Sequence, residues 1–450
     1  MKLMNRTQLM SQGNVSKSLL KLGIPMVISM LVTALYNVVD TYFVNGLGKQ
    51  AVAAVTVAFP ISLVFSGVGL TFGVGAGSFI SRLLGKKENK RADEVASTAI
   101  ISSTAIGLLV AMLALLCLTP MLKFMGAIPS IMTVAKDYAI FFVISCIFST
   151  ANVTAGNLAV AQGAANISLT AMISGAVLNM LLDPLFIYGF NMGVQGAAIA
   201  TLISQTVTSA IYLWFFSSGK SYVKIRLRDF SPSVSMYWEI FKVGVSMLLL
   251  QLLSSLSMSR LSAEAGHYGE ETIAAMGIVL RIVTLGSNAV FGYMKGFQPM
   301  AGFNYSAQNF SRLKQAIKSC MKWTTVFCVV WTLLIFLFAS PILSLFSDDP
   351  RVLNIAIPAL KANVIMFFSF GFQFTYSTLY LAMGKALVGG FLNICRQGIM
   401  FIPVILILPS IFGLNGVVYS QVVADLLTTV VTIFFAISIH RKLQNKELEK

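Results

Sequence analysis

Residues 21–54 read KLGIPMVISMLVTALYNVVDTYFVNGLGKQAVAA, and residues 242–275 read KVGVSMLLLQLLSSLSMSRLSAEAGHYGEETIAA. A shift of 221 residues aligns Lys21 and Gly23 with Lys242 and Gly244, and it brings further landmarks into register without a gap. These are Gly75 with Gly296, Arg91 with Arg312, Pro120 with Pro341, and Gly163 with Gly384; a shift of 220 then aligns Gly193 and Gly196 with Gly413 and Gly416. The chain is therefore built from two copies of one unit.

The composition places both copies in a membrane. Of the 450 residues 57% are hydrophobic and 11% charged, and the mean hydropathy is +0.82, more apolar surface than one soluble core can bury. Apolar stretches long enough to span a bilayer are expected near residues 19–44, 52–81, 93–118, 134–160, 166–189 and 194–216, and again near 239–264, 273–301, 316–340, 354–383, 386–411 and 416–438. Because lipid cannot satisfy unpaired backbone groups, these spans are predicted to be helices. We expect an all-α membrane protein with twelve transmembrane helices in two pseudo-symmetric six-helix bundles.

The expected organisation follows from these spans. Residues 1–16 form an N-terminal segment, 17–216 the first lobe with helices 1–6, 217–238 a polar linker, 239–440 the second lobe with helices 7–12, and 441–450 a tail. Two apolar repeats joined by a polar linker are typical of transporters with a cavity between two bundles.

The distribution of the charged residues predicts how the chain is oriented in the membrane. The chain has 32 Lys and Arg against 16 Asp and Glu, and the basic residues concentrate in alternate loops, after the second span, in the linker and after the eighth span. This positive-inside pattern predicts a multi-pass protein of the cell membrane with both termini and the linker in the cytoplasm. We expect no nucleic-acid partner, since the net charge reports membrane orientation.

Sequence motifs exclude several other classes. The five cysteines all lie in predicted spans without paired spacing, which indicates neither disulfides nor a zinc site. There is no phosphate-binding loop and no metalloprotease helix. We therefore expect no cofactor, and energy for transport would come from an ion gradient or another subunit.

Two carboxylates stand inside predicted spans of the first lobe. Asp40 lies near the outer end of the first span and Asp183 near that of the fifth. Tyr36 and Asn179 each precede one of them by four residues and so share its helix face, and Thr201 is at a similar depth on the sixth span. Pro184 cannot donate to the carbonyl of Met180 and should loosen the helix there.

Two carboxylates in one dry pocket share a proton or capture a cation. Asn179 and Thr201 supply neutral oxygens suited to Na⁺, so the cluster Asp40, Asn179, Asp183 and Thr201 is a predicted ion-coupling site for H⁺ or Na⁺. The alternative is polar contacts that only bridge helices. The repeat has Leu261 and Pro403 at the two equivalent positions, so the fold itself does not require acids there.

The second lobe carries different charges: Arg260, Glu264, Arg281, Lys295, Lys361, Arg396 and Asp425. Arg260 and Glu264 are spaced to pair on one helix, and Arg396 is expected to pair with Asp425 across helices. Arg281 and Lys295 lack an obvious local partner and are candidates for a cavity wall. Candidates for an adaptable apolar cavity are Met30, Phe59, Met172 and Met258.

Several stretches together resemble the multidrug and toxic compound extrusion (MATE) family. They are residues 21–54 quoted above, LNMLLDPLFIYGFNMGVQGAAIATLISQ at 178–205, GNLAVAQG at 156–163 with its counterpart STLYLAMG at 377–384, and GFQPMAGFNYSAQN at 296–309. The resemblance covers about residues 17–438 and is greatest to the MepA and DinF-like branch.

The resemblance implies a V-shaped antiporter that exports lipophilic, mostly cationic drugs in exchange for H⁺ or Na⁺. The family's first-lobe cation site falls on Asp40, Asn179, Asp183 and Thr201, and Tyr36 and Asn157 match further positions implicated in that lobe. The chain departs from one branch of the family, which carries an acid in the middle of the seventh helix. Gln251, Ser254 and Ser255 stand there instead, which puts a second-lobe cation site in doubt.

Two rival functions remain at this stage. A flippase for a lipid-linked anionic precursor would need unpaired bases such as Arg281, Lys295, Lys361 and Arg396 in the cavity, whereas drug export predicts an apolar, net-acidic cavity. An enzyme acting inside the membrane is not expected, since no nucleophile and base occur at helical spacing. We expect the protein to act as a monomer in the lipid bilayer on small-molecule drugs and organic cations.

Overall fold

The computed structural model describes residues 10–125, 127, 129–347 and 349–448. The first lobe contains α2 (Val15–Asn45), α3 (Lys49–Gly85), α4 (Asn89–Leu116), α5 (Leu118–Phe124), η1 (Pro129–Ile131), α6 (Met132–Ala161), α7 (Ala165–Pro184), η2 (Leu185–Gly189) and α8 (Gly193–Ser217). The linker holds η3 (Leu227–Asp229). The second lobe contains α9 (Val234–Gly266), α10 (Glu270–Ser306), α11 (Phe310–Leu337), α12 (Ala339–Ser344), α13 (Pro350–Ile365), α14 (Phe367–Ala382), α15 (Ala386–Ile394), η4 (Cys395–Met400), α16 (Phe401–Phe412) and α17 (Leu414–Leu448).

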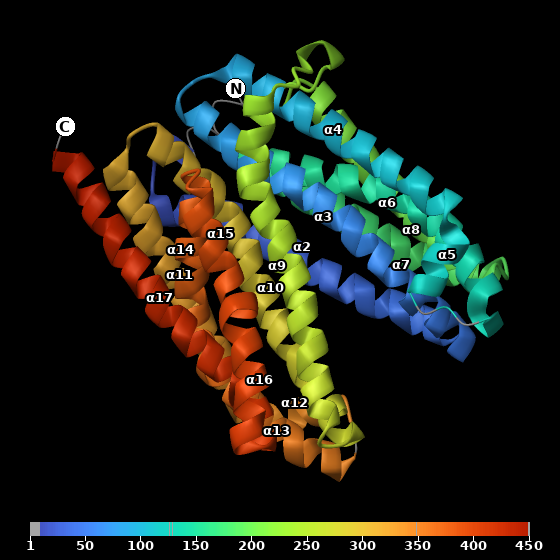
Figure 1. The fold of residues 1–450 in the computed structure, drawn as a ribbon. Helices are drawn as coiled ribbons and strands as arrows, with labels where there is room; N and C mark the ends of the chain where they lie inside the picture. Colours follow the sequence, from blue (N-terminus) through green and yellow to red (C-terminus); the bar gives the residue numbers. More distant parts are fainter. Residues whose placement is uncertain (1–9, 126, 128, 348, 449–450) are drawn as a thin grey trace.

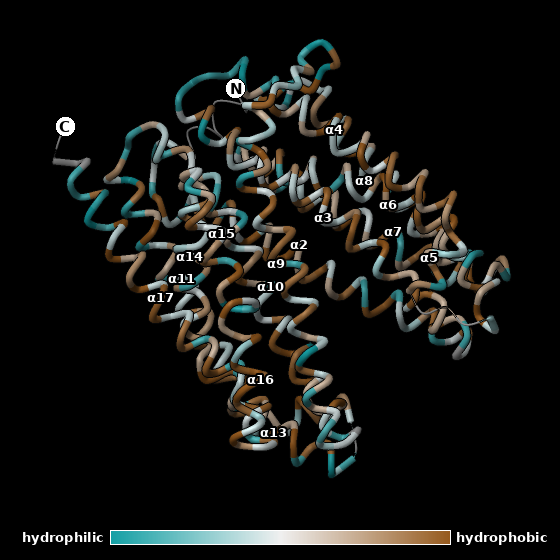
Figure 2. The backbone as a smooth tube through the Cα atoms, in the orientation of Figure 1, coloured by the Kyte–Doolittle hydropathy of each residue, from teal (hydrophilic) through white to brown (hydrophobic). Residues whose placement is uncertain are grey.

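This architecture confirms the predicted fold class. Across the described ranges, eleven helices are long and apolar enough to span a bilayer, and α13 with α14 makes a twelfth span that bends by 44°. That bend, at Met366, interrupts a span expected to be continuous. Figure 2 shows hydrophobic residues along the helices and hydrophilic residues gathered mainly near their ends.

The two lobes form the arms of a V (Figure 1). They meet near the face where α2 begins and α17 ends, here called the terminal face, and they diverge at the opposite end. The linker also lies at the terminal face.

The repeat is visible in the backbone conformation. Gly163 and its equivalent Gly384 have φ of 81° and 75°, and Lys87 and its equivalent Gln308 have φ of 63° and 56°. Left-handed conformations are uncommon for residues other than glycine. Their recurrence at equivalent turns shows that both copies fold by the same local rules.

Repeated glycines bring the lobes together in a contact here called the seam. Gly23 of α2 lies against Gly296 of α10, where an added Cβ at Gly296 would lie 2.6 Å from the Gly23 nitrogen. Gly75 of α3 and Gly244 of α9 likewise face the backbone of the opposite helix. Gly244 and Gly296 are the repeat equivalents of Gly23 and Gly75, so the two contacts are related by the pseudo-symmetry of the chain. Small residues permit such close helix approach in membranes.

One of the two contacts also carries an ion pair. Arg82 of α3 reaches Glu239 of α9 at 3.1 Å, and Lys242 pairs with the same carboxylate. The hydroxyl of Ser78 donates to the carbonyl of Leu381 in α14 at 2.7 Å. The equivalents of Arg82 and Glu239 in the repeat are Phe303 and Ser18, so this ion pair has no symmetric counterpart.

Two segments cross the terminal face from one lobe to the other, and we call them straps. The first strap, residues 10–13, precedes the first lobe yet binds the second: the Arg312 guanidinium of α11 donates to the carbonyls of Met10, Gln12 and Gly13 at 3.0, 2.8 and 2.7 Å. Asn304 of α10 donates to the Met10 carbonyl as well, at 3.0 Å.

The second strap is the linker, which leads into the second lobe and binds the first. The backbone nitrogens of Lys224, Arg226 and Ser231 donate to side chains of α4, namely Asp93 at 2.7 Å, Ser97 at 3.0 Å and Thr98 at 3.1 Å. Each lobe therefore holds the segment that enters the first helix of the other lobe.

The seam predicts a position-specific cost of adding a side chain. Gly296→Val would force the valine Cβ against the backbone of α2, whereas Gly277→Val on the same helix would meet open space. We expect the first change to lower the free energy of unfolding by about 1–3 kcal/mol and the second to have little effect. Thermal melting of the detergent-purified variants measures the difference, and equal melting temperatures would contradict the packing described.

The first strap predicts a difference between two repeat-equivalent arginines. Arg312→Gln removes the donors to three carbonyls, and we expect it to lower the free energy of unfolding by about 1–3 kcal/mol. Arg91→Gln is the control, because Arg91 is exposed and its contacts, an ion pair with Glu88 at 3.5 Å and a guanidinium placed over the Phe79 ring at 5.6 Å, are of small energetic value. The same melting experiment compares them, with equal destabilisation as the outcome that would refute a clamping role for Arg312.

Candidate functional site

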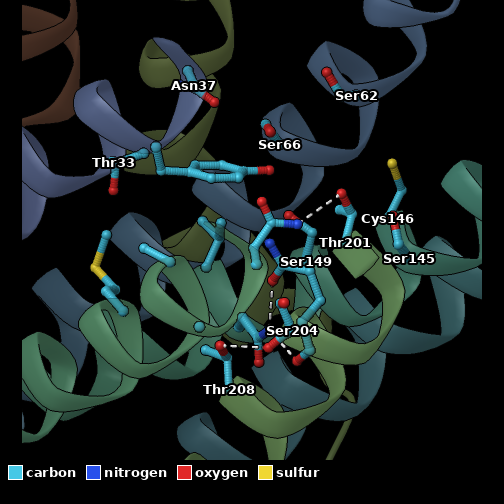
Figure 3. Close-up of a pocket in the computed structure, with 18 of the residues that line it drawn as sticks. Thr33, Asn37, Ser62, Ser66, Ser145, Cys146, Ser149, Thr201, Ser204 and Thr208 are labelled. Carbon is cyan, nitrogen blue, oxygen red and sulfur yellow. Dashed lines mark hydrogen bonds between the residues drawn. The ribbon is translucent and has the colours of Figure 1, made fainter. Parts of the chain in front are cut away.

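A cavity of about 540 Å³ opens within the first lobe. Its walls come from α2, α3, α6, α7 and α8, and Lys295 of α10 contributes from the second lobe. Figure 3 shows polar side chains from several of these helices directed into one space, among them Asn37, Ser62, Ser149, Ser204 and Thr208. Polar side chains are thus interspersed among the apolar ones that line this cavity.

Most of the predicted ion-coupling residues meet at one end of this cavity. Tyr36, Asp40, Asn179 and Thr201 line it. Asp183 lies behind this wall and has no solvent-exposed surface. Its carboxyl group interacts electrostatically with that of Asp40, so the two acids predicted to share a site do so.

Asn179 connects the buried acid to the cavity. With its amide oriented to satisfy both ends, its nitrogen donates to Asp183 Oδ2 at 3.0 Å and its oxygen lies 3.3 Å from the Thr201 hydroxyl. The second carboxylate oxygen, Asp183 Oδ1, meets no hydrogen-bond donor among the described residues, and the Asp40 carboxyl, which is within hydrogen-bonding reach of the Asp183 carboxyl, can donate to it only when protonated. A buried carboxylate oxygen without a donor is costly unless a proton or a cation joins it. The donor set of two carboxylates, an amide and a hydroxyl therefore fits H⁺ or Na⁺.

The helix beside Asp183 is irregular, as expected from the neighbouring Pro184. Pro184 ends α7, and the chain continues through the π-helical turn η2 (Leu185–Gly189) before α8 begins. Proline removes one helix donor, and π-helical turns often occur at functional sites.

Asn157, the remaining residue predicted for ion coupling, lies elsewhere. It lines the other end of the same cavity and a small second cavity that also contacts Lys295. Eleven residues of α6 separate it from Cys146, which lies close to Tyr36, so the separation along the helix is about 16 Å. The structure therefore does not bring Asn157 to the acids.

Of the residues predicted to line a substrate cavity, some line this cavity and others do not. Phe59, Met172 and Lys295 line the cavity. Met30 does not line it, but its sulfur lies 4.0 Å from Lys295 Nζ. Met258 of α9 and Arg281 of α10 are exposed and do not line this cavity, contrary to expectation, because residue type alone does not tell which side chains of a span reach a given cavity.

Several cavity residues were not predicted. They are small polar side chains that recur three or four residues apart: Ser62 and Ser66 on α3, Ser145, Ser149 and Asn152 on α6, and Ser204 and Thr208 on α8. This spacing places them on one helix face, and it was the signal that could have revealed them.

The second lobe has polar side chains at some of the equivalent positions, but there other side chains occupy the space between them. Asn152 of α6 donates to Gln205 of α8 at 2.8 Å, and the repeat equivalents of these two residues, Gln373 and Asp425, also meet, through a 3.0 Å bond from Gln373 to the Asp425 carbonyl. Arg396 Nε pairs with Asp425 Oδ1 at 2.7 Å, which confirms the predicted pair.

Arg396 occupies the position equivalent to Ala176, which lines the cavity of the first lobe. Its guanidinium packs over the Phe370 ring at 4.6 Å, and Gln421 also donates to Asp425, at 2.8 Å. In the second lobe a tethered cation thus lies where the first lobe has space.

The other charges of the second lobe lie apart from the cavity. No ion pair joins Arg260 and Glu264 among the ion pairs of the described chain, so the pairing expected from their spacing is wrong. Arg260 is exposed. Lys361 places its ammonium over the Phe336 ring at 5.0 Å.

Comparisons with known proteins agree with this architecture. The MatE family model matches residues 25–185 and 244–407. The multidrug export protein MepA of Staphylococcus aureus (strain MRSA252) is 29% identical over 412 residues, covering 91% of each chain, and MepA of Staphylococcus haemolyticus (strain JCSC1435) is 28% identical over 433 residues, covering 96% of this chain and 95% of its own.

Solved structures are similar over nearly the whole length. The outward-facing conformation of a multidrug resistance MATE family transporter of the MOP superfamily superposes with a TM-score of 0.91 at 30% identity, covering 98% of this chain and 99% of its own. A MOP superfamily transporter from Pyrococcus furiosus Vc1 (DSM3638), described as having a binding pocket of reverse polarity, superposes with a TM-score of 0.90 at 30% identity and covers 98% of both chains. The two matched repeats, the twelve-span fold and the MepA relatives together show that this chain belongs to the MatE family and is a transporter, not an enzyme.

Proposed function

We propose that the protein is a cation-coupled multidrug efflux antiporter, which exports lipophilic, mostly cationic compounds in exchange for H⁺ or Na⁺. The MepA relatives are named as multidrug export proteins, and their similarity extends over both lobes. The protein works as a monomer in the cell membrane, with the terminal face and both termini in the cytoplasm. The basic loops and linker on that face support this orientation.

The observation that carries the proposal is the buried Asp183 carboxylate, with one oxygen unpartnered in the described structure, beside Asp40 at the cavity wall. An acid in a membrane interior is costly, and no cationic side chain of the described residues forms an ion pair with this one. Asp425 in the second lobe shows the contrasting, structural solution, since its charge is matched by Arg396. The acids of the first lobe are instead available to an exchangeable cation.

The mechanism follows from the position of this cluster. With the terminal face in the cytoplasm, the lobes diverge toward the outside (Figure 1), and an incoming H⁺ or Na⁺ reaches Asp40 and Asp183 from there. Binding removes one negative charge from the pair, which permits α2 to repack against the cavity and expel its contents. Coupling requires only that the ion and the drug favour different conformers.

The flippase alternative receives little support from the placement of the bases. Of the four basic residues that it needs, Arg396 is paired with Asp425, Lys361 packs on an aromatic ring and Arg281 is outside the cavity wall. Only Lys295 lines the cavity, opposite Asp40. A strongly cationic cavity is therefore not formed by these residues.

The proposal predicts which acids are needed for transport. We expect Asp40→Asn and Asp183→Asn each to reduce efflux of ethidium by about tenfold or more, because neither variant can exchange a cation at the site. Efflux is measured in inverted vesicles under separate H⁺ and Na⁺ gradients, so the gradient that drives the intact protein also identifies the ion.

Asp229→Asn, a change to an acid in the linker, is the control and should transport normally. Full ion-driven efflux by either first-lobe variant would refute the coupling role of that acid. Absence of gradient-driven efflux by the intact protein would refute the antiporter itself.

A stability comparison separates the functional acids from the structural one. Asp425→Asn breaks a buried ion pair and should lower the free energy of unfolding by about 3–5 kcal/mol. Asp183→Asn removes one of two like charges that face each other and keeps an acceptor for Asn179, so its melting temperature should equal or exceed that of the intact protein. Comparable destabilisation by both changes in a thermal melt would show that Asp183 is a structural residue.

A further inference from the structure

Lys295 is a base of the second lobe that faces a cavity of the first. It projects from α10, lines the 540 Å³ cavity and also borders a small cavity of about 10 Å³ beside Asn157 and Gln298. The latter has room for about one water molecule. Lys295 is thus half-buried between the lobes, at the end of the main cavity nearer to the terminal face.

The ammonium of Lys295 has no acidic partner in the described part of the chain. Its polar contact is with the weak acceptor Met30 Sδ, at 4.0 Å, and no carboxylate of the described residues lies within ion-pair distance. A charge in such a position needs a purpose or a partner. The repeat does not require it, because the equivalent residue of the first lobe is Val74.

The cavity therefore carries opposite charges at its two ends. Met30, next to Lys295, and Asp40 are ten residues apart on α2, which corresponds to about 15 Å along the helix. The length suits a drug-sized molecule, and the polar side chains between the two ends, such as Ser66 and Ser149, can hydrogen-bond to it.

We propose that Lys295 is a specificity-determining residue that binds an anionic group, so that the cavity preferentially takes amphoteric substrates with a carboxylate at the Lys295 end and a cationic or aromatic body toward Asp40. The proposal rests on the export function proposed above and names its substrate class. Because Lys295 belongs to the second lobe, such a substrate contacts both lobes at once, whereas a simple cation binds within the first.

Two dyes that differ by one carboxylate test this inference. Rhodamine B carries a cationic ring system and a free carboxylate at neutral pH, and its ethyl ester carries the same cation alone. Binding of each dye to the detergent-purified protein is measured by fluorescence polarisation, and transport by uptake into inverted vesicles. Binding is read independently of transport.

The variants isolate the charge. Lys295→Met keeps the length of the side chain and its packing against Met30 but removes the ammonium, and Lys295→Arg keeps the charge. Arg281→Met is the matched control, since it removes a base from the same helix outside the cavity wall. Binding of the ester and thermal melting show that each variant is folded.

We expect Lys295→Met to weaken rhodamine B binding by about tenfold, the effect of losing one charge-assisted contact, and to leave or improve binding of the ester. Lys295→Arg should restore the preference, and Arg281→Met should not change it. Equal effects of Lys295→Met on both dyes, or failure of the intact protein to bind rhodamine B more tightly than the variant, would overturn the inference. If the dyes bind as expected but neither is transported under any gradient, the proposed export function fails while the anion site stands.

Discussion

The close contact of two pairs of helices through glycine is the constraint on which the rest of the molecule depends. At the seam, Gly23 lies against Gly296, and Gly75 and Gly244 face opposite backbones. A helix pair packed this closely at one end of the molecule leaves the other ends of the lobes free to diverge (Figure 1). Because the glycines are repeat equivalents, the same glycine-mediated helix contact occurs twice. The two contacts define the axis about which the two lobes are arranged.

The candidate functional residues occupy positions at which the two repeats differ. The same turns, glycines and polar positions recur in both lobes, yet Ala176 leaves space in the first and Arg396 fills the equivalent place in the second. In the described structure the acids beside the cavity of the first lobe form no ion pair, whereas the second lobe neutralises Asp425 with Arg396. One scaffold thus supports an exchangeable ion site in one copy and a fixed ion pair in the other.

The sequence was sufficient for the fold and for part of the site, for physical reasons. Hydropathy reports span length directly, and the repeat identifies equivalent helices, so the twelve spans and the pairing of Arg396 with Asp425 could be predicted. Helix spacing placed Asn179 beside Asp183 and Tyr36 on the face of Asp40 in the same way. These are relations along one helix or between residues at equal depth.

Relations that depend on helix rotation and packing could not be predicted. Arg281 and Met258 do not line the cavity, Asn157 lies a long way from the acids along α6, and Arg260 does not meet Glu264. The bend between α13 and α14 could not be predicted either, because Met366 is neither a proline nor a glycine.

The straps have a further consequence, for biosynthesis. The carbonyl of Met10 binds a side chain 302 residues later, so the entrance to α2 stays without its clamp until α11 has been synthesised and inserted. Since chains fold from the N-terminus during synthesis, the first lobe forms in the bilayer before its own N-terminal strap can be docked, and insertion of α11 is the event that allows the strap to bind at the terminal face.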